Sequence, residues 1–195
     1  MFEEFERYLT EKARLNADEI LAVKAVSMEK KIKKKQYLLH EGGICHYNCF
    51  IVKGCLRLYS ISDDGTEYIL RFAVENWWMS DRESYNSGSP SRYNIDALED
   101  CEVILIDKSD FGQLLKSIPN FKIFIDDLLA RSYDAIQNRV MGAISYTAEE
   151  RYRNFVARFP DIFHRIPLHM MASYLGVSRE TLSRIRSLYV QKLKG

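Results

Sequence analysis

Three charged side chains near the C-terminus have the types and the spacing that base recognition requires. Arg179, Glu180 and Arg184 lie in the stretch "GVSRETLSRIR", and residues three or four apart in a helix share one face. An arginine can donate to O6 and N7 of guanine, and a glutamate can accept from N4 of cytosine. A solvated helix with a Glu180–Arg184 ion pair would show the same letters, so the surrounding register has to decide.

The residues around this stretch match a helix-turn-helix. That motif needs two short helices, a small residue where they touch and a glycine in the turn, and Ala172 and Gly176 occupy those places. Ser178 stands where the N-cap of the second helix is expected. The apolar contact positions hold Met171, Leu175, Val177, Leu182 and Ile185. This register favours the interpretation that the three charged residues face outward and enter the major groove of double-stranded DNA.

Nearby hydroxyl and lysine side chains suit phosphate oxygens, which fix the register of a protein on DNA. We assign Ser178, Thr181, Ser183 and Lys192 to this role. From Arg151 onward nine Lys and Arg residues stand against two acidic ones, a net charge of +7, whereas residues 1–150 hold 19 basic and 25 acidic residues, a net charge of −6. A basic segment on an acidic body is the expected electrostatic pattern of a DNA-binding domain attached to a larger unit.

The composition and the termini indicate a globular protein. With 47% hydrophobic and 28% charged residues over 195 positions, the chain has an ordinary soluble composition. No apolar run approaches the ~20 residues that span a bilayer. The acidic start "MFEEFERYLTEK" lacks the apolar core of a signal peptide. We therefore expect a cytoplasmic protein without membrane contact.

Four cysteines raise the alternative of a metal site. Cys45, Cys49 and Cys55 lie in "CHYNCFIVKGC", and Cys101 follows later. This spacing matches no common zinc pattern. The segment also reads as a strand, in which cysteine behaves as a small buried hydrophobe. We expect free thiols and assign no metal, cofactor or catalytic residue, and leave open a redox role of the first three.

The middle of the chain predicts antiparallel β structure between helices. Residues 2–26 read as two amphipathic helices with Asn16 as a cap, and Lys30–Lys35 reads as the exposed face of a strand. From Val26 to Asp107 short runs rich in Ile, Val, Leu, Tyr and Phe alternate with turn residues. The turn "SDDGTE" predicts a hairpin with a type I′ loop. Strands at this spacing without intervening helices indicate a sandwich, barrel or jelly roll.

Helical periodicity returns after Asp107. Ser109 is expected to cap a short helix that stops before Pro119, and residues 120–146 predict one long helix. Its apolar stripe consists of Phe121, Ile125, Leu128, Leu129, Ser132, Ile136, Val140 and Ala143. Such a stripe is typical of a helix that pairs with a copy of itself. Thr147 to Glu150 form a capping-box pattern, so a new domain is expected to begin there, and Pro167 is placed in the first turn of a later helix.

In this order the pieces resemble the Crp/Fnr family of transcription regulators. "SRETLSR" resembles the recognition helix of the catabolite activator branch, and "YLLHEGGICHYNCFIVKGCLRLY" is similar to the family's first strands. "WW" and "AEERY" resemble a compact, Bacteroidetes-like branch. The resemblance implies an α+β chain: a cyclic-nucleotide-binding-like jelly roll over 1–118, a dimerisation helix over 119–146 and a helix-turn-helix domain over 147–195. It also implies a homodimer on DNA with RNA polymerase as a partner.

The expected sensor pocket departs from the family pattern. Members that bind cyclic AMP carry a Gly-Glu pair and a phosphate-binding arginine, and here Ser80-Asp81 and Ser91 stand in those places. Arg92 follows one residue late, which on a strand points to the opposite face. The pocket wall is then assigned to Trp78, Asp81, Arg92 and Tyr93. The pocket is expected to hold either an unidentified small-molecule effector other than a cyclic nucleotide or no ligand at all.

Two other classes of function remain as alternatives. A cyclic-nucleotide-responsive module that acts on a protein partner would share the jelly roll but would not need a helix-turn-helix. An enzyme would need a catalytic motif, and we find no nucleophile elbow, P-loop or H-E-x-x-H pattern. The four histidines, His40, His46, His164 and His169, are scattered. The sequence therefore favours a regulator that is not an enzyme.

Overall fold

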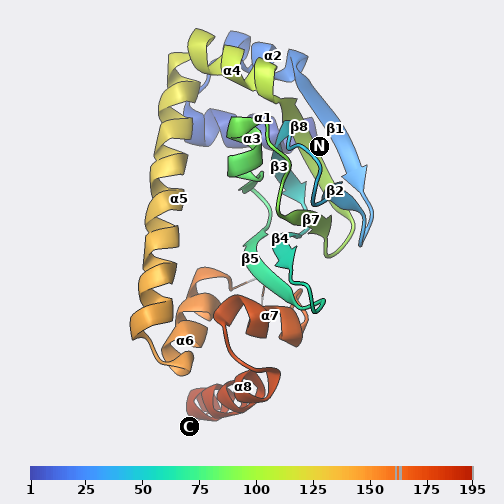
Figure 1. Cartoon of the computed structure of the whole chain (residues 1–195). Helices are drawn as coiled ribbons and strands as arrows, with labels where there is room; N and C mark the ends of the chain where they lie inside the picture. Colours follow the sequence, from blue (N-terminus) through green and yellow to red (C-terminus); the bar gives the residue numbers. More distant parts are fainter. Residues whose placement is uncertain (161, 163, 195) are drawn as a thin grey trace.

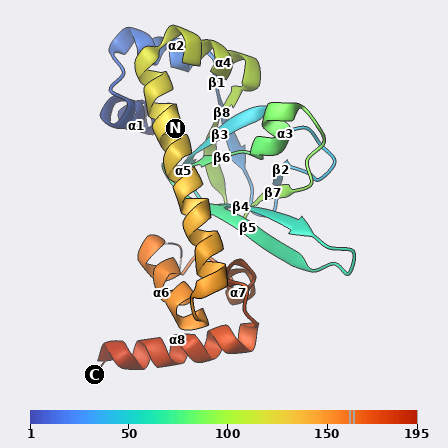
Figure 2. The ribbon, with the colours of Figure 1, turned by 60° about the vertical axis from the view of Figure 1, so that its left-hand side comes forward.

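Two helices and a π-helical turn open the chain, and they cover one sheet of a jelly roll. The computed structural model describes residues 1–160, 162 and 164–194, with side chains of the last helix described as far as Tyr189. The helices are α1 (Phe2–Tyr8), η1 (Leu9–Ala13), α2 (Ala17–Ala25), α3 (Arg82–Ser87), α4 (Lys108–Ser117), α5 (Pro119–Ser145), α6 (Ala148–Arg158), α7 (Leu168–Leu175) and α8 (Arg179–Lys194). The long helix α5 runs beside the jelly roll from α4 to the C-terminal helices (Figure 1; Figure 2).

The jelly roll consists of two four-stranded antiparallel sheets with the strand orders β1-β8-β3-β6 and β2-β7-β4-β5. The strands are β1 (Ser27–Ile32), β2 (Tyr37–Leu39), β3 (Tyr47–Lys53), β4 (Leu56–Ile61), β5 (Glu67–Ala73), β6 (Trp78–Met79), β7 (Asn94–Ala97) and β8 (Cys101–Asp107). Ile51, Leu56 and Val103 are among the fully buried residues of the core that both sheets share. The predicted α+β fold class with a jelly roll and a long helix is confirmed.

Sheet β2-β7-β4-β5 is also buried on its second face. Tyr59 lies opposite Ile69 across β4 and β5, so the two side chains share a face. With Phe72 they belong to the cluster that the C-terminal helices build around Phe155 and Leu182. The helix-turn-helix part therefore packs directly on the jelly roll.

Aromatic residues attach the N-terminal helices to the other sheet. The ring of Phe5 lies 4.6 Å from that of Phe50 and 5.7 Å from that of Trp78, centroid to centroid. Asn16 caps α2 in a capping box with Glu19, which confirms the predicted cap. Strand β1 exposes most of its side chains, so Lys30 and Lys31 lie on an exposed strand as predicted, whereas Lys33, Lys34 and Lys35 follow the strand.

The β4–β5 hairpin forms at the predicted place but not with the predicted turn. Gly65 has a φ of +82°, whereas Asp64 keeps a negative φ, and a type I′ loop needs both to be positive. The Asp64 carboxylate instead accepts from the Thr66 amide at 3.0 Å and from the Ser62 hydroxyl at 2.5 Å. These bonds hold a longer loop, so the type I′ prediction is wrong.

Two further predictions of helix starts are wrong by one or two residues. The N-cap of α4 is Asp107, whose carboxylate accepts from the Ser109 amide at 2.8 Å. Ser109, the predicted cap, lies in the first turn. Pro167 precedes α7 as its N-cap instead of lying in its first turn. The predicted capping box of Thr147 and Glu150 at the start of α6 is present.

The long helix α5 has 27 residues and starts with Pro119 at its first position, where a missing amide proton costs nothing. Its N-terminal part packs into the core through Phe121, Phe124 and Ile125. Beyond that the helix leaves large apolar side chains exposed. Among the described residues, no helix has both the length and the apolarity needed to cross a bilayer.

Two glycines with positive φ, one crowded and one open, allow a test of how tightly the β3–β4 turn packs against Cys101 of β8. Gly54 has a φ of +107°, and a Cβ there would lie 2.4 Å from Cys101 Sγ and 2.9 Å from Cys101 Cα. Gly65 has a φ of +82° with nothing within 4 Å. Gly65→Ala should therefore cost only the ~1 kcal/mol of the left-handed backbone, and Gly54→Ala about 3 kcal/mol or more because the backbone of Cys101 must move. Urea unfolding of both variants measures the difference, and equal losses would contradict the clash.

Candidate functional site

The two helices of the predicted motif meet as the sequence indicates. α7 ends at Gly176 in the left-handed conformation with a φ of +65°, and the Val177 amide donates to the Ala172 carbonyl at 3.1 Å. α8 then begins with the Ser178 hydroxyl accepting from the Thr181 amide at 3.1 Å. Ala172, Leu182 and Ile185 are buried where the helices touch. The apolar register of the sequence therefore forms a helix-turn-helix geometry.

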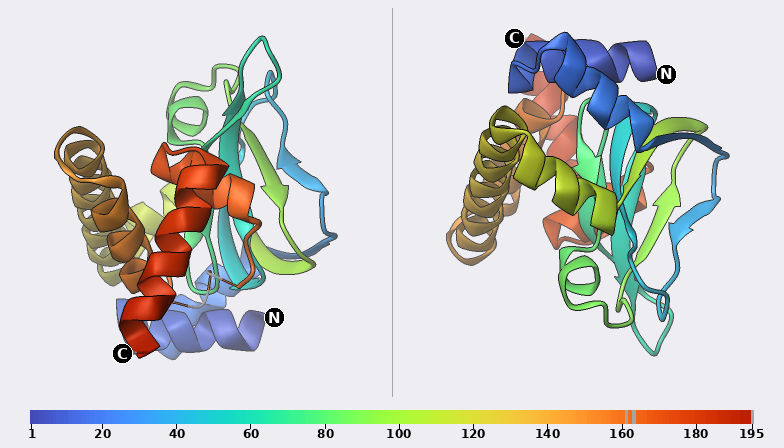
Figure 3. Two further views of the ribbon diagram at one scale, coloured as in Figure 1. Left: turned by 90° about the horizontal axis from the view of Figure 1, so that it is seen from below. Right: turned by 90° about the horizontal axis from the view of Figure 1, so that it is seen from above.

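The N-terminal half of one face of α8 presents polar and charged side chains to solvent. Arg179, Glu180, Ser183 and Arg184 are all exposed. The solvated-helix alternative would have an ion pair between Glu180 and Arg184. Among the described residues no such ion pair is present. α8 lies at the end of the molecule opposite the N-terminal helices, and in the view from below it lies in front of the other elements (Figure 1; Figure 3). The charged face is therefore not covered by another part of the described chain.

The start of α8 keeps the carboxyl group of Glu180 ionised. The Glu180 backbone amide and the Ser178 hydroxyl both lower the pKa of this carboxyl group, and nearby Arg179 adds to the effect. An ionised carboxylate accepts hydrogen bonds and donates none. Glu180 can therefore pair with an amino group such as cytosine N4 but not with a carbonyl oxygen or a phosphate.

The residues assigned to phosphate contacts divide into three groups. Ser178 and Thr181 lie at the N-terminus of α8 with their hydroxyl oxygens 3.1 Å apart, and a helix N-terminus attracts anions. Ser183 is exposed on the charged face. Lys192 lies outside the residues whose side chains are described. The sequence did not single out Ser187, which is exposed one turn beyond Ser183. The Ser187 hydroxyl donates to the Ser183 carbonyl oxygen at 3.1 Å.

In the jelly roll, Asp81 and Ser91 form a buried pair. The Ser91 hydroxyl donates to the Asp81 carboxylate at 2.7 Å and accepts from the Tyr93 amide at 3.0 Å. Asp81 also caps α3 by accepting from the Glu83 amide at 3.1 Å. Ser91 is 3% exposed and Asp81 is 4% exposed. The polar groups at this position therefore bind one another.

The other residues assigned to the pocket wall lie apart. Arg92 is exposed, pairs with Glu83 at 2.6 Å, and lies 5.8 Å from the centre of the Tyr93 ring. Trp78 packs with Phe5 and Phe111 under the N-terminal helices. The structure thus brings Asp81 to the main chain of Tyr93 through Ser91 and places the Arg92 guanidinium near the Tyr93 ring, whereas Trp78 lies apart with the N-terminal helices.

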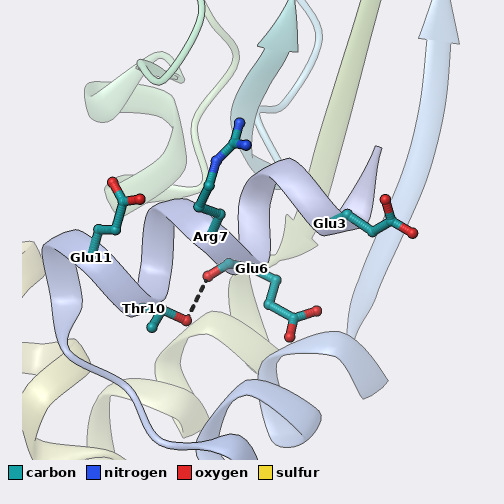
Figure 4. Close-up of a pocket in the computed structure, with 5 residues that line it drawn as sticks. All are labelled: Glu3, Glu6, Arg7, Thr10 and Glu11. Carbon is teal, nitrogen blue, oxygen red and sulfur yellow. Dashed lines mark hydrogen bonds between the residues drawn. The ribbon is translucent and has the colours of Figure 1, made fainter.

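Two hollows among the described residues were considered as ligand sites. A cavity of about 90 Å³ in the jelly roll is lined by Leu38, Leu39, Ile44, Cys45, His46, Tyr47, Met79, Ser80 and Ile95. A surface depression of about 410 Å³ lies along α1 and η1, lined by Glu3, Glu6, Arg7, Thr10 and Glu11. In Figure 4 these five side chains extend from one helix in different directions. That depression therefore offers no converging groups for a ligand.

Sequence reasoning missed a charged network on the outer face of sheet β2-β7-β4-β5. Arg57 donates to both Asp96 oxygens, from Nε at 2.7 Å and from Nη2 at 2.9 Å, and it also pairs with Glu67. Its guanidinium lies 3.9 Å from the centre of the Tyr59 ring. Arg57 is 6% exposed and Asp96 is 5% exposed. The sequence signal for this network was a charged residue of each sign inside an otherwise apolar strand, an Arg in "LRLY" and an Asp in "NIDA".

The four cysteines are buried free thiols. Burial raises the pKa of the Cys55 thiol to about 12 and that of Cys101 to about 11, and it also raises the pKa of Cys45 and Cys49. A protonated, buried thiol is a poor nucleophile and a poor metal ligand. Among the residues that the structure describes, no group of three or more potential metal ligands gathers.

Arg165, between α6 and α7, connects the C-terminal helices to two loops of the jelly roll. It donates to both carboxylate oxygens of Glu75 at 2.9 Å and to Glu99 from Nε at 3.1 Å. Glu75 Oε1 also accepts from the Gly54 amide at 2.7 Å. This clamp holds the helix-turn-helix part in place beside the jelly roll.

The clamp predicts a pH dependence of stability. Burial acts to raise the pKa of Glu75, but the hydrogen bonds from Arg165 and from the Gly54 amide outweigh it and lower the pKa below 4.5. A lowered carboxyl pKa stabilises the fold above the unfolded-state value, and this contribution is lost as the pH falls through the folded-state value. Glu75→Gln should therefore cost about 1–2 kcal/mol at neutral pH and much less near pH 3. Urea unfolding at both pH values checks this. The control Glu3→Gln, on an exposed side chain, should show neither effect.

Comparisons with known proteins match this arrangement. Residues 29–118 match the family described as "Cyclic nucleotide-binding domain". The chain has the Crp/Fnr fold. The cAMP-activated global transcriptional regulator CRP of Haemophilus influenzae is 24% identical over 165 residues, which cover 80% of this chain and 74% of that protein. The resemblance to Crp/Fnr regulators is thereby confirmed, and the compact Bacteroidetes-like branch stays a prediction.

Two solved structures show the likeness of the fold. FixK2 from Bradyrhizobium japonicum superposes with a TM-score of 0.74 at 20% identity and covers 86% of each chain. The c-di-GMP responsive global regulator CLP of Xanthomonas campestris superposes with a TM-score of 0.72 at 14% identity, covering 91% of this chain and 94% of its own. The Crp/Fnr fold therefore extends beyond residues 29–118 to the long helix and the C-terminal helices.

Proposed function

We propose that the protein is a sequence-specific DNA-binding transcription regulator that acts as a homodimer in the cytoplasm. The exposed polar face of α8, with Arg179, Glu180 and Arg184, carries this proposal. Leu182 and Ile185 fix the opposite face to the rest of the motif. A helix held in this way places its N-terminal residues in a major groove. Ser178, Thr181 and Ser183 would contact phosphates beside it, and Lys192 is assigned the same role from the sequence.

The dimer is supported by an exposed apolar stripe on α5, which shares Leu129, Ile136 and Val140 with the stripe expected from the sequence. Leu129, Tyr133, Ile136, Val140 and Ile144 are 36%, 62%, 60%, 50% and 76% exposed. Their spacing of three or four residues places them on one side of the helix. A second copy of α5 fits this stripe, because an identical helix offers the same spacing of apolar side chains. The dimer would span residues 120–146, as the sequence predicts.

Such a dimer would read a two-fold symmetric site. Two recognition helices contact successive major grooves when they lie about one helical turn, ~34 Å, apart. DNA bound in this way is available to RNA polymerase, the further partner that the Crp/Fnr resemblance implies. A regulator of this kind carries out no chemical step, so we propose no enzymatic activity.

The sensor domain would take an effector other than cyclic AMP. At the position of the family's phosphate-binding arginine stands Ser91, whose hydroxyl is already bound to Asp81 at 2.7 Å. A cyclic phosphate placed there would meet the Asp81 carboxylate without a cation to offset the repulsion. The exposed Arg92 is engaged by Glu83. The cyclic nucleotide-binding domain thus supports a small-molecule effector of undetermined identity.

The base-reading role of Arg184 is tested by selecting bound DNA from a random pool. Arg184→Ala should cost about 1–3 kcal/mol on the best site and relax the preference at one base pair, because a bidentate contact is lost. Arg153→Ala removes the same charge from the exposed face of α6 and should leave the base preference unchanged. Equal loss on all sequences with Arg184→Ala would exclude direct reading.

The same selection tests the function itself. A two-fold symmetric consensus should emerge both with and without cyclic AMP, and binding should weaken steeply as salt increases. No enrichment of any sequence would favour the alternative, a cyclic-nucleotide-responsive module that acts on a protein partner.

A glutamate on the apolar stripe should separate the dimer. Ile136→Glu would bury a charge between two α5 helices, at a cost of several kcal/mol, and light scattering should then give the mass of one chain. Asn138 is exposed on the other side of the same helix, so Asn138→Glu should remain dimeric. A wild-type mass of 22.8 kDa in solution, the mass of one chain, would contradict the dimer.

A further inference from the structure

Arg139 connects the three parts of the molecule at one point. From α5 its Nη1 donates to the Leu70 carbonyl of β5, and its Nη2 donates to the Ile69 carbonyl at 3.2 Å. The same Nη2 lies 3.4 Å from the Tyr174 carbonyl of α7, and the guanidinium lies 4.2 Å from the centre of the Tyr174 ring. One side chain of the long helix thus contacts the jelly roll and the first helix of the helix-turn-helix.

Ser173 of α7 makes a second connection between α7 and strand β5. Its hydroxyl accepts from the Ile69 amide at 3.0 Å and donates to the Glu67 carbonyl at 2.8 Å. β5 is an edge strand of its sheet, and edge strands leave such main-chain groups without partners. Ser173 therefore satisfies one donor and one acceptor of this edge, as a neighbouring strand would.

Glu67 extends this connection into the sheet. Its carbonyl accepts from Ser173, while its carboxylate pairs with Arg57. Arg57 is held in turn by both oxygens of the buried Asp96. The position of Ser173 on β5 is therefore defined by a strand whose own side chains are fixed by a buried ion pair. Figure 1 shows α7 lying against β5.

We propose that Ser173 and Arg139 are positioning residues, which hold α7 on β5 and thereby set the direction of α8 relative to α5. The proposal rests on the proposed function, because direction matters only if two α8 helices must fit one DNA site. α7 and α8 are packed on each other through Ala172 and Leu182, so α8 follows α7. The α5 pair would define the two-fold axis, and the contacts of Arg139 fix α7 to that axis.

Apolar packing alone would not fix this direction. Tyr59, Ile69 and Phe72 pack against the C-terminal helices, but apolar contacts are non-directional and allow small shifts between surfaces. Hydrogen bonds to main-chain groups at 2.8 to 3.4 Å have a defined geometry. They specify one register of α7 along β5.

The test uses the full chain and compares two DNA duplexes. Ser173→Ala removes both hydrogen bonds of the hydroxyl at little change in volume, and Ser173→Thr keeps the hydroxyl. Ser117→Ala, in which the hydroxyl bonds only within α4, is the control. Each protein is titrated with the selected two-fold site and with a random duplex at low salt. Random binding depends on charge and not on the direction of α8.

Ser173→Ala should bind the selected site about fivefold more weakly, the factor that ~1 kcal/mol of lost hydrogen bonding gives, with no change on the random duplex. Ser173→Thr should restore at least half of the loss on a logarithmic scale. Arg139→Gln should act in the same direction. Arg131→Gln should not, because among the described residues the Arg131 side chain hydrogen-bonds to Asp127 of its own helix. Equal weakening on both duplexes, or tighter binding to the selected site, would overturn the positioning role.

Hydrogen exchange separates this proposal from the function on which it rests. The Ile69 amide, which donates to Ser173 at 3.0 Å, should exchange at least tenfold faster in Ser173→Ala, with amides of β3 and β8 unchanged. An unchanged Ile69 amide would show that no such connection exists in solution. If the wild-type chain selects no DNA sequence while the Ile69 amide responds as expected, the proposed function fails and the connection between β5 and α7 stands.

Discussion

The packing of the C-terminal helices on sheet β2-β7-β4-β5 is the constraint on which the rest of the structure depends. A sheet of a jelly roll normally buries one face and leaves the other to solvent. Here Leu56 and Ile95 fill the inner core, while Tyr59 and Phe72 on the other face enter the core of the C-terminal helices. Because this sheet belongs to two cores, the jelly roll and the helix-turn-helix cannot move independently without exposing apolar surface to water.

A sheet that is buried twice also requires its charges to be paired. Arg57 and Asp96 lie on the outer face of neighbouring strands at 6% and 5% exposure. An unpaired ion at that depth would cost several kcal/mol, so both partners and their bidentate geometry are needed together. The pair also holds Glu67, whose main chain meets α7. Burial of the sheet thus explains why charged residues occur inside otherwise apolar strands.

The sequence predicted features that depend on near neighbours. The capping groups of Asn16 and Thr147, the turn at Gly176 and the apolar register of Leu182 are all decided within about four residues of each position, and the structure contains them. The contacts that the sequence did not predict join distant segments. Arg57 and Asp96 are 39 residues apart and Ile69 and Ser173 are 104 apart. Trp78 was placed at the sensor pocket because of its neighbours in sequence, although the N-terminal helices supply its contacts.

The same packing determines which surfaces remain for other molecules. The C-terminal helices use the buried side of α8 and most of α7, and the jelly roll uses the first part of α5. The polar face of α8 and the apolar stripe of α5 are left exposed, and they differ in chemistry. Exposed apolar side chains at helical spacing are stabilised by burial against a like surface, whereas arginines beside an ionised glutamate are stabilised by hydrogen-bonding groups of both kinds. A second copy of the chain would satisfy the first surface and DNA base edges would satisfy the second, so one way of packing accounts for both proposed partners.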